Sequence, residues 1–236
     1  MTEKNAVYVE PENQADAAVI LMHGLGADGH DFESMVPELG LSGLGRAEQG
    51  RAEPGRAVAP SIRWIFPHAP VRSVTVNGGY SMRAWYDIIA IDPNAPEDEA
   101  GICESAAAIG AFIHTEMEKG IPADRIVLAG FSQGGAMALY TALRQAESLA
   151  GLIAMSCYLP LPGKLASEES NANRGIPIFM AHGTFDPVVP FAFGETARDL
   201  LRADGHAVEW HEYQMDHSVC QQEVADLRKW LLSVLG

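Results

Sequence analysis

Short apolar runs alternate along the chain with longer segments whose apolar residues recur every three or four positions. Five of the runs have the length of buried strands, and they cover residues 17–24, 61–70, 125–131, 151–156 and 177–183. Segment 207–214 alternates apolar and polar residues, which is typical of a less buried strand. The pattern therefore predicts six strands.

Helices are predicted between these strands. The clearest has apolar residues at three- and four-residue steps and ends at Gly120 and Pro122; these residues are Ile102, Ala106, Ile109, Ile113 and Met117. Further helical patterns cover residues 135–145, 193–202 and 220–234. This alternation indicates an α/β fold with a mostly parallel sheet and helices on both faces. Because no linker interrupts it, we expect a single domain over residues 1–236.

Residues 45–59 break the alternation. They read GRAEQ, GRAEP and GRAVA, three pentapeptides in tandem. The period is too short for a solenoid repeat, and the small and charged residues offer nothing to pack against a core. The segment is predicted to be a mobile surface insertion within the domain, and a lid or docking site is the functional alternative.

The charge balance narrows the range of partners. Among 236 residues, 16 are basic and 31 acidic, which gives a net charge of −15. Such a field repels phosphate backbones and anionic lipid headgroups, so we expect neither nucleic acid nor a membrane surface as partner. The uncharged stretch 126–143 is interrupted by glycines and fits a strand, a turn and a helix better than a membrane span.

The cysteines and the N-terminus favour a cytoplasmic location. The three cysteines, Cys103, Cys157 and Cys220, are odd in number and widely spaced, as free thiols in a reducing compartment are. No CxxC pair is present, and His211-Glu212 with His217 does not satisfy HExxH, so no metal site is expected. The first residues also lack the basic and apolar regions of a signal peptide.

A GxSxG pentapeptide spans Gly130 to Gly134, with Ser132 at its centre. It follows a predicted strand and precedes a predicted helix, the context of a nucleophile elbow. Glycines on both sides let the turn tighten, and the helix N-terminus favours negative charge on a substrate oxygen. Ser132 is therefore a candidate nucleophile, and a glycine-rich turn with a capping serine is the structural alternative.

A serine nucleophile needs a base and an acid, which follow it along the chain in α/β-hydrolases. Of the histidines after Ser132, His217 lies between the last strand and the last helix, on a loop that can reach the carboxyl edge of the sheet. Asp186 follows the strand at 177–183 and reaches the same edge, so it would orient His217 and stabilise the imidazolium. Each residue also has a purely structural alternative. His217 could be a helix-capping or surface histidine, and Asp186 could form the turn before Pro187.

A second glycine motif is open to two interpretations. Residues 24–29 match GxGxxG after a strand, which is the fingerprint of a dinucleotide-binding oxidoreductase. The acidic residue expected at the end of a second strand is missing, because the repeat occupies that region. The same loop suits an oxyanion hole, in which the backbone N–H groups of Leu25 and Gln133 donate to one oxygen. We favour the oxyanion hole.

Six ordered blocks resemble the phospholipase/carboxylesterase family, which includes bacterial carboxylesterases and acyl-protein thioesterases. The blocks are HGLGADGHDF (23–32), FPHAP (66–70), MRAWYDI (82–88), GFSQGG (130–135), HGTFDPVVP (182–190) and MDHSV (215–219). The resemblance implies an α/β-hydrolase fold with no large cap domain. It also implies cofactor-free hydrolysis of carboxylic esters, thioesters or lysophospholipids, and it allows a homodimer.

By position, the resemblance assigns Ser132, Asp186 and His217 as the catalytic triad and Leu25 and Gln133 as the oxyanion hole. It places Trp85 and Val188 near the acyl site. The expected function is a serine carboxylesterase that works through an acyl-enzyme and takes small neutral acyl substrates. The alternatives are a dinucleotide-binding oxidoreductase and a non-catalytic binding protein of the same fold.

Overall fold

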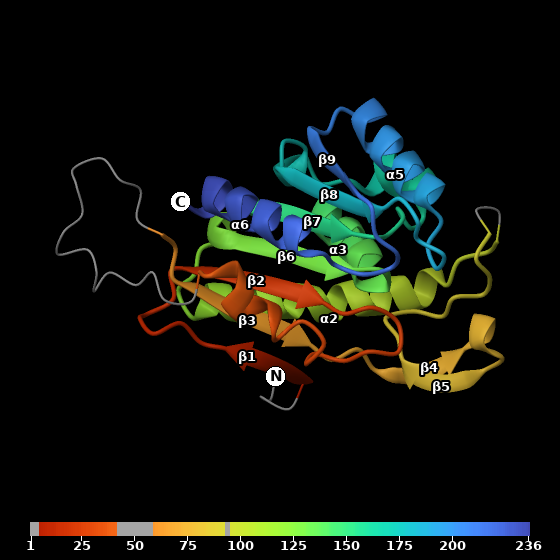
Figure 1. Ribbon diagram of the computed structural model, residues 1–236, viewed down its shortest axis with the longest axis horizontal. Helices are drawn as coiled ribbons and strands as arrows, with labels where there is room; N and C mark the ends of the chain where they lie inside the picture. The colour runs from red at the N-terminus through yellow and green to blue at the C-terminus, as the bar shows by residue number, and fades with distance from the viewer. Residues whose placement is uncertain (1–4, 42–58, 93–94) are drawn as a thin grey trace.

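A seven-stranded sheet forms the centre of the computed structural model, which describes residues 5–41, 59–92 and 95–236 (Figure 1). In spatial order the strands are β1 (Ala6–Val9), β3 (Ile62–Pro67), β2 (Ala17–Met22), β6 (Ile126–Phe131), β7 (Gly151–Met155), β8 (Ile178–Gly183) and β9 (Val208–Tyr213). Only β1 runs antiparallel to its neighbour within this sheet. The predicted mostly parallel sheet is confirmed.

Two layers of helices cover the sheet, and this explains why its central strands are apolar throughout. Helices α2 (Glu99–Glu118), α3 (Gln133–Arg144) and α5 (Phe191–Ala203) pack on one face, and α1 (Met35–Leu39) and α6 (Gln221–Leu235) pack on the other. Successive strand residues point to opposite faces, so Ile20 joins the first layer and its neighbours Val19 and Leu21 join the second. Both faces are therefore buried, and every residue of β2, β6, β7 and β8 is buried.

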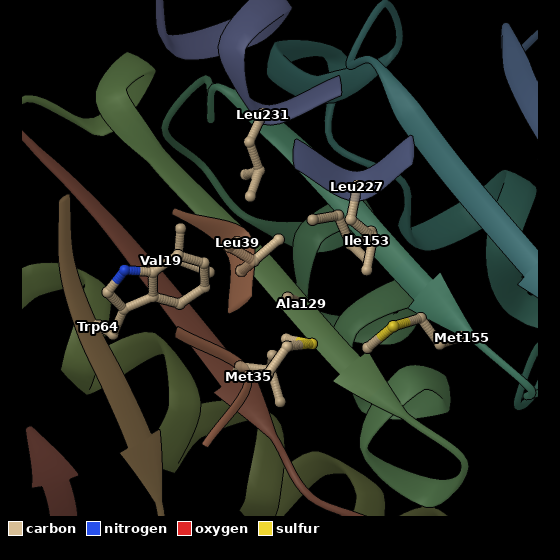
Figure 2. Close-up of a pocket in the computed structure, with 10 residues that line it drawn as sticks. Val19, Met35, Leu39, Trp64, Ala129, Ile153, Met155, Leu227 and Leu231 are labelled. Atoms are coloured by element: carbon tan, nitrogen blue, oxygen red, sulfur yellow. The ribbon is translucent and has the colours of Figure 1, made fainter. Parts of the chain in front are cut away.

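The packing between the sheet, α1 and α6 leaves a void of about 10 Å³. Figure 2 shows side chains from four strands and both helices turned toward it, among them Val19, Leu39, Trp64 and Leu227. A void of this size holds at most one water molecule, and an apolar lining offers water no partners. We interpret it as a packing gap in the core rather than a ligand site.

Several short elements were not predicted. The hairpin of β4 (Val71–Val74) and β5 (Tyr80–Arg83) forms a separate two-stranded sheet, and α4 (Leu165–Glu168) lies in the connection from β7 to β8. The tandem pentapeptides at 45–59 fall almost wholly outside the described residues. None of the helices in the described part of the chain is long and apolar enough to cross a membrane.

Candidate active site

Ser132 occupies a strained turn between β6 and α3. Its backbone has φ 55° and ψ −122°, a region that L-residues seldom adopt and that is often associated with functional sites. The turn is tight, because a Cβ on Gly130 would lie 2.1 Å from the Gly134 carbonyl oxygen, and one on Gly134 would lie 2.1 Å from that of Met22. Any residue larger than glycine at either position would push the helix away from the sheet. The glycines of the motif thus hold Ser132 at the end of the strand.

Asp186 and His217 come together at the carboxyl edge of the sheet, after β8 and β9. His217 Nδ1 lies 2.6 Å from Asp186 Oδ2 and donates to it. The other carboxylate oxygen accepts the backbone N–H groups of Val188 and Val189, at 2.8 and 2.9 Å. The Asp186 side chain is fully buried, and three donors satisfy it. Asp186 therefore does both things that the sequence offered as alternatives: it caps the turn through the two backbone N–H groups, and it contacts the imidazole of His217.

His217 also lies beside the turn that holds Ser132. Its imidazole packs against the ring of Phe131, the residue before Ser132, with 4.6 Å between ring centroids. Ser132 is 9% exposed, so its surroundings are largely dry. The three predicted residues therefore follow strands β6, β8 and β9 and gather at the carboxyl edge of the sheet.

A fourth side chain, His182, lies behind the aspartate. Its Nε2 donates to the Val189 carbonyl oxygen at 2.9 Å and lies 3.5 Å from Asp186 Oδ2. Burial lowers the pKa of His182, so the ring is neutral beside the carboxylate. Gly194 packs so closely that a Cβ there would lie 2.3 Å from His182 Nδ1. The sequence analysis assigned no role to His182 and missed this contact.

The loop that carries Leu25 is anchored from both sides. The Gly26 N–H donates to the Arg83 carbonyl oxygen at 2.9 Å. His23 is buried, donates from Nδ1 to the Gly24 carbonyl oxygen at 2.7 Å, and accepts the Ala69 N–H at Nε2. Burial lowers the pKa of His23 to about 4, so its ring is neutral with the proton on Nδ1.

The side chain of Gln133 ties α3 to the segment that follows β5. Its Oε1 accepts the backbone N–H of Trp85, and its Nε2 donates to the Tyr86 carbonyl oxygen, both at 2.8 Å. The Trp85 indole in turn donates to the His23 carbonyl oxygen at 2.9 Å. These bonds connect the two backbone segments expected to form the oxyanion hole, Leu25 and Gln133.

Trp85 therefore holds a different position from the one predicted. The sequence analysis placed it near the acyl group, but it is 2% exposed and is not among the residues that line the cavity beside Ser132. Its indole donates to the carbonyl oxygen of His23, two residues before Leu25. Val188 lines that cavity.

The cavity beside Ser132 has a volume of about 300 Å³. Ser132, Gln133 and Leu25 border it, and most of the remaining lining is apolar; the apolar side chains include Val76, Ile88, Ile89, Ile91, Leu159, Val188, Val189, Phe193 and Leu200. Its volume is at the lower end of the usual range for small-molecule sites. Asp87, Asp92 and Glu97 also face it, and no lysine or arginine is among the residues that line it.

The hydroxyls of two tyrosines form a polar spot within this apolar lining. Tyr86 and Tyr158 have their phenolic oxygens 2.6 Å apart. Burial raises the pKa of Tyr158 to about 12 and that of Tyr86 well above its usual value, so both phenols are neutral. The cavity as a whole suits a neutral aliphatic group better than an anionic one.

The glycine motif at 24–29 lacks the geometry of a dinucleotide site. The chain leaves β2 at Met22 and passes through turns before α1 begins at Met35, so no helix starts at these glycines. Gly29 instead packs against β3, where a Cβ would lie 2.3 Å from the Phe66 carbonyl oxygen. A pyrophosphate would find no helix N-terminus here.

Comparison with known proteins is consistent with this architecture. The family model described as phospholipase/carboxylesterase matches residues 39–235. Acyl-protein thioesterase 1 of Neurospora crassa is 44% identical over 91% of this chain and 85% of its own length. Acyl-protein thioesterase 1 of Cryptococcus neoformans is 34% identical over 99% of each chain.

Solved structures agree with these relatives. The crystal structure of Zea mays acyl-protein thioesterase 2 superposes with a TM-score of 0.81 at 28% identity, over 98% of this chain and 99% of that one. Arabidopsis thaliana SOBER1 gives a TM-score of 0.81 at 27% identity, over 93% and 99%. The fold is thus that of the α/β-hydrolases.

Proposed function

This chain belongs to the phospholipase/carboxylesterase family, and on that premise we propose that it hydrolyses acyl esters and thioesters with Ser132, His217 and Asp186 as its catalytic triad. The observation that carries the proposal is the convergence of these residues at one edge of the sheet. Ser132 sits on the strained turn, and His217 packs against Phe131 and donates to the buried Asp186.

The first half of the proposed reaction is the attack on the acyl carbonyl. His217 takes the Ser132 proton at Nε2 while Ser132 Oγ attacks the carbonyl carbon. The Asp186 carboxylate keeps the histidine proton on Nδ1 and stabilises the imidazolium that forms. The backbone N–H groups of Leu25 and Gln133 receive the developing oxyanion. Gln133 is the first residue of α3, whose first N–H groups have no partner inside the helix.

The second half returns the enzyme to its starting state. The alcohol or thiol leaves with the proton from His217, and the acyl group stays on Ser132. Water then attacks the acyl-enzyme with His217 again acting as base, which releases the acid. Side chains and backbone N–H groups supply every step, so the proposed reaction requires no cofactor.

The cavity beside Ser132 supports an aliphatic acyl group as the part of the substrate that binds. An acyl chain would lie along side chains such as Ile88, Ile91 and Leu159, and the leaving group would face the open side. Asp87, Asp92 and Glu97 would repel an acyl chain that ends in a carboxylate. The similarity to proteins named acyl-protein thioesterase supports thioesters as substrates in addition to oxygen esters.

Two further features of this function are proposals. The odd number of cysteines and their free thiols support a cytoplasmic location. The resemblance to the family supports a homodimer, which sedimentation of the purified protein would detect.

A series of neutral esters and thioesters of increasing acyl length tests the proposal, with Ser132→Ala as the matched blank. We expect kcat/KM to rise with chain length until the cavity is filled and then to level off or fall. Dicarboxylic half-esters of equal length should react more slowly. Turnover in Ser132→Ala should drop by at least about 10⁴-fold. Comparable turnover in that variant would overturn the assignment of the nucleophile.

A further inference from the structure

A second histidine and carboxylate cluster lies away from the site described above. Glu169 follows α4, and Asp204 and His206 lie in the turn between α5 and β9. One ligand atom from each lies within 4.8 Å of the others. This turn leads into Val208, which pairs with Ile178 where β9 and β8 begin. The cluster is therefore near the amino ends of these strands, whereas Asp186 and His217 follow their carboxyl ends.

The buried members of this cluster have no hydrogen-bond partners. The side chains of Glu169 and His206 are each 1% exposed, and Nε2 of the ring lies 2.7 Å from a Glu169 oxygen. That contact is short, but it lacks the direction of a hydrogen bond, and neither Glu169 oxygen nor either His206 nitrogen has a hydrogen-bond partner among the described residues. Leaving such buried groups without hydrogen bonds costs free energy, which a bound ion would recover.

We propose that Glu169, Asp204 and His206 form a binding site for a divalent transition-metal ion, with zinc as its preferred occupant. An imidazole nitrogen with two carboxylates is a donor set that zinc accepts, with water in the fourth position. Calcium and magnesium prefer oxygen ligands alone.

The charges around the cluster also favour a cation. Two carboxylates face one imidazole, and within the described residues the further ion pair to this cluster comes from Arg174, whose Nε lies 3.2 Å from Glu169 Oε2. The Arg174 side chain is 60% exposed, so solvent screens it and it compensates little of the buried charge. A divalent ion would neutralise the excess.

The bound ion would fasten two connections of the fold to each other. Glu169 belongs to the segment between β7 and β8, and the other two ligands belong to the segment between α5 and β9. The ion would stabilise the folded chain by mass action without touching Ser132. Sequence spacing could not reveal this site, because Glu169 and the Asp204–His206 pair are separated along the chain by β8 and α5. The site departs from the expectation of no metal.

Zinc binding by the untagged full-length protein, freed of metal by dialysis against a chelator, tests the proposal. Equilibrium dialysis should find one tightly bound zinc equivalent, and zinc should raise the Tm more than magnesium does. His206→Gln should remove this equivalent. Asp204→Asn, at a partly exposed position that tolerates an isostere, should weaken zinc affinity at least about 10-fold and keep the fold if His206→Gln does not.

Two control variants separate this site from other histidines. His30→Gln removes an exposed histidine paired with Glu33, and His217→Gln removes the histidine beside Asp186. Both should retain the equivalent. The proposal is overturned if the protein binds no zinc, or if zinc binding survives in folded His206→Gln and Asp204→Asn. Loss of binding only in His217→Gln would assign the ion to the other edge and contradict it equally.

Discussion

Two histidine–carboxylate pairs with nearly equal N···O distances lie at opposite ends of strands β8 and β9. His217 and Asp186 are 2.6 Å apart, and His206 and Glu169 are 2.7 Å apart. In the first pair the ring N–H donates to one oxygen and two backbone N–H groups occupy the other. In the second pair neither carboxylate oxygen is hydrogen-bonded by any residue that the structure describes. Distance alone therefore does not distinguish a carboxylate that orients a catalytic histidine from one that is proposed to ligate an ion; the direction of the contact and the remaining donors do.

The difference has a physical consequence. A carboxylate with three donors is stabilised as an anion and holds one rotamer, which is what a base needs from its orienting partner. A buried carboxylate whose contacts are not aligned as hydrogen bonds bears more of the desolvation cost, and its oxygens remain available as ligands. We therefore assign the first pair to chemistry at Ser132 and the second to an ion.

Removal of the carboxylate charge from each pair should give the largest difference in kcat between two variants. Asp186→Asn should lower kcat by roughly 10³- to 10⁴-fold, because an amide in place of the carboxylate favours the wrong tautomer of His217. Glu169→Gln should leave kcat within about twofold, since its pair is remote from Ser132. Steady-state hydrolysis of one ester by both folded variants measures this contrast. Equal losses in the two variants would mean that the pairs are not functionally distinct.

A smaller loss is expected from the support of the oxyanion loop. Trp85→Phe keeps an aromatic ring, although a smaller one, and removes the indole donor to the His23 carbonyl oxygen. The Leu25 N–H should then be less well placed, and kcat should fall about 10-fold with little change in KM, because the interaction acts in the transition state. A rise in KM at constant kcat would instead return Trp85 to the acyl-binding role inferred from sequence.

A third buried carboxyl extends the comparison to stability. Burial raises the pKa of Glu223 in α6 to about 8, and the nearby Cys220 N–H offsets this only in part and forms no well-aligned hydrogen bond. Folded Glu223 keeps a proton that the unfolded chain releases above about pH 4.5. Its contribution to the free energy of unfolding is therefore complete below that pH and is lost as the pH rises toward 8, by at most about 1.4 kcal/mol per pH unit.

Glu223→Gln should remove this dependence with the smallest effect on turnover. Glutamine preserves the side-chain volume and has no charge, so the variant should unfold at a higher Tm than the parent at pH 8. The difference should shrink toward pH 5. Thermal unfolding of both proteins at pH 8 and pH 5 measures this difference. A larger Tm difference at pH 5 than at pH 8 would contradict the raised pKa of Glu223.

The strongly apolar strands and the long helices were predictable because burial on both faces leaves a clear pattern. Strand β1 and the β4–β5 hairpin were missed, since they are four residues long and partly exposed, and carry little of that pattern. The chain order of nucleophile, acid and base led to Ser132, Asp186 and His217.

The hydrogen bonds that support the Leu25 loop left no local pattern in the sequence. Trp85 reaches the His23 carbonyl oxygen across 62 positions and Gln133 across 48, so only the folded chain brings them together. The resemblance of the MRAWYDI block to the family placed Trp85 near the acyl site. In the structure Trp85 is buried and its indole is hydrogen-bonded to the His23 carbonyl oxygen. These contacts, which no local sequence pattern reveals, decide where the side chain lies.

Covalent labelling tests the central claim most directly. A fluorophosphonate reacts with a serine only where a base activates it and an oxyanion hole receives the phosphoryl oxygen. Mass spectrometry of the digested, labelled protein should locate one adduct on the peptide that contains Ser132, and the adduct should be absent from Ser132→Ala and strongly slowed in Asp186→Asn. An active enzyme that takes up no label at Ser132, or takes it up at another residue, would contradict the account.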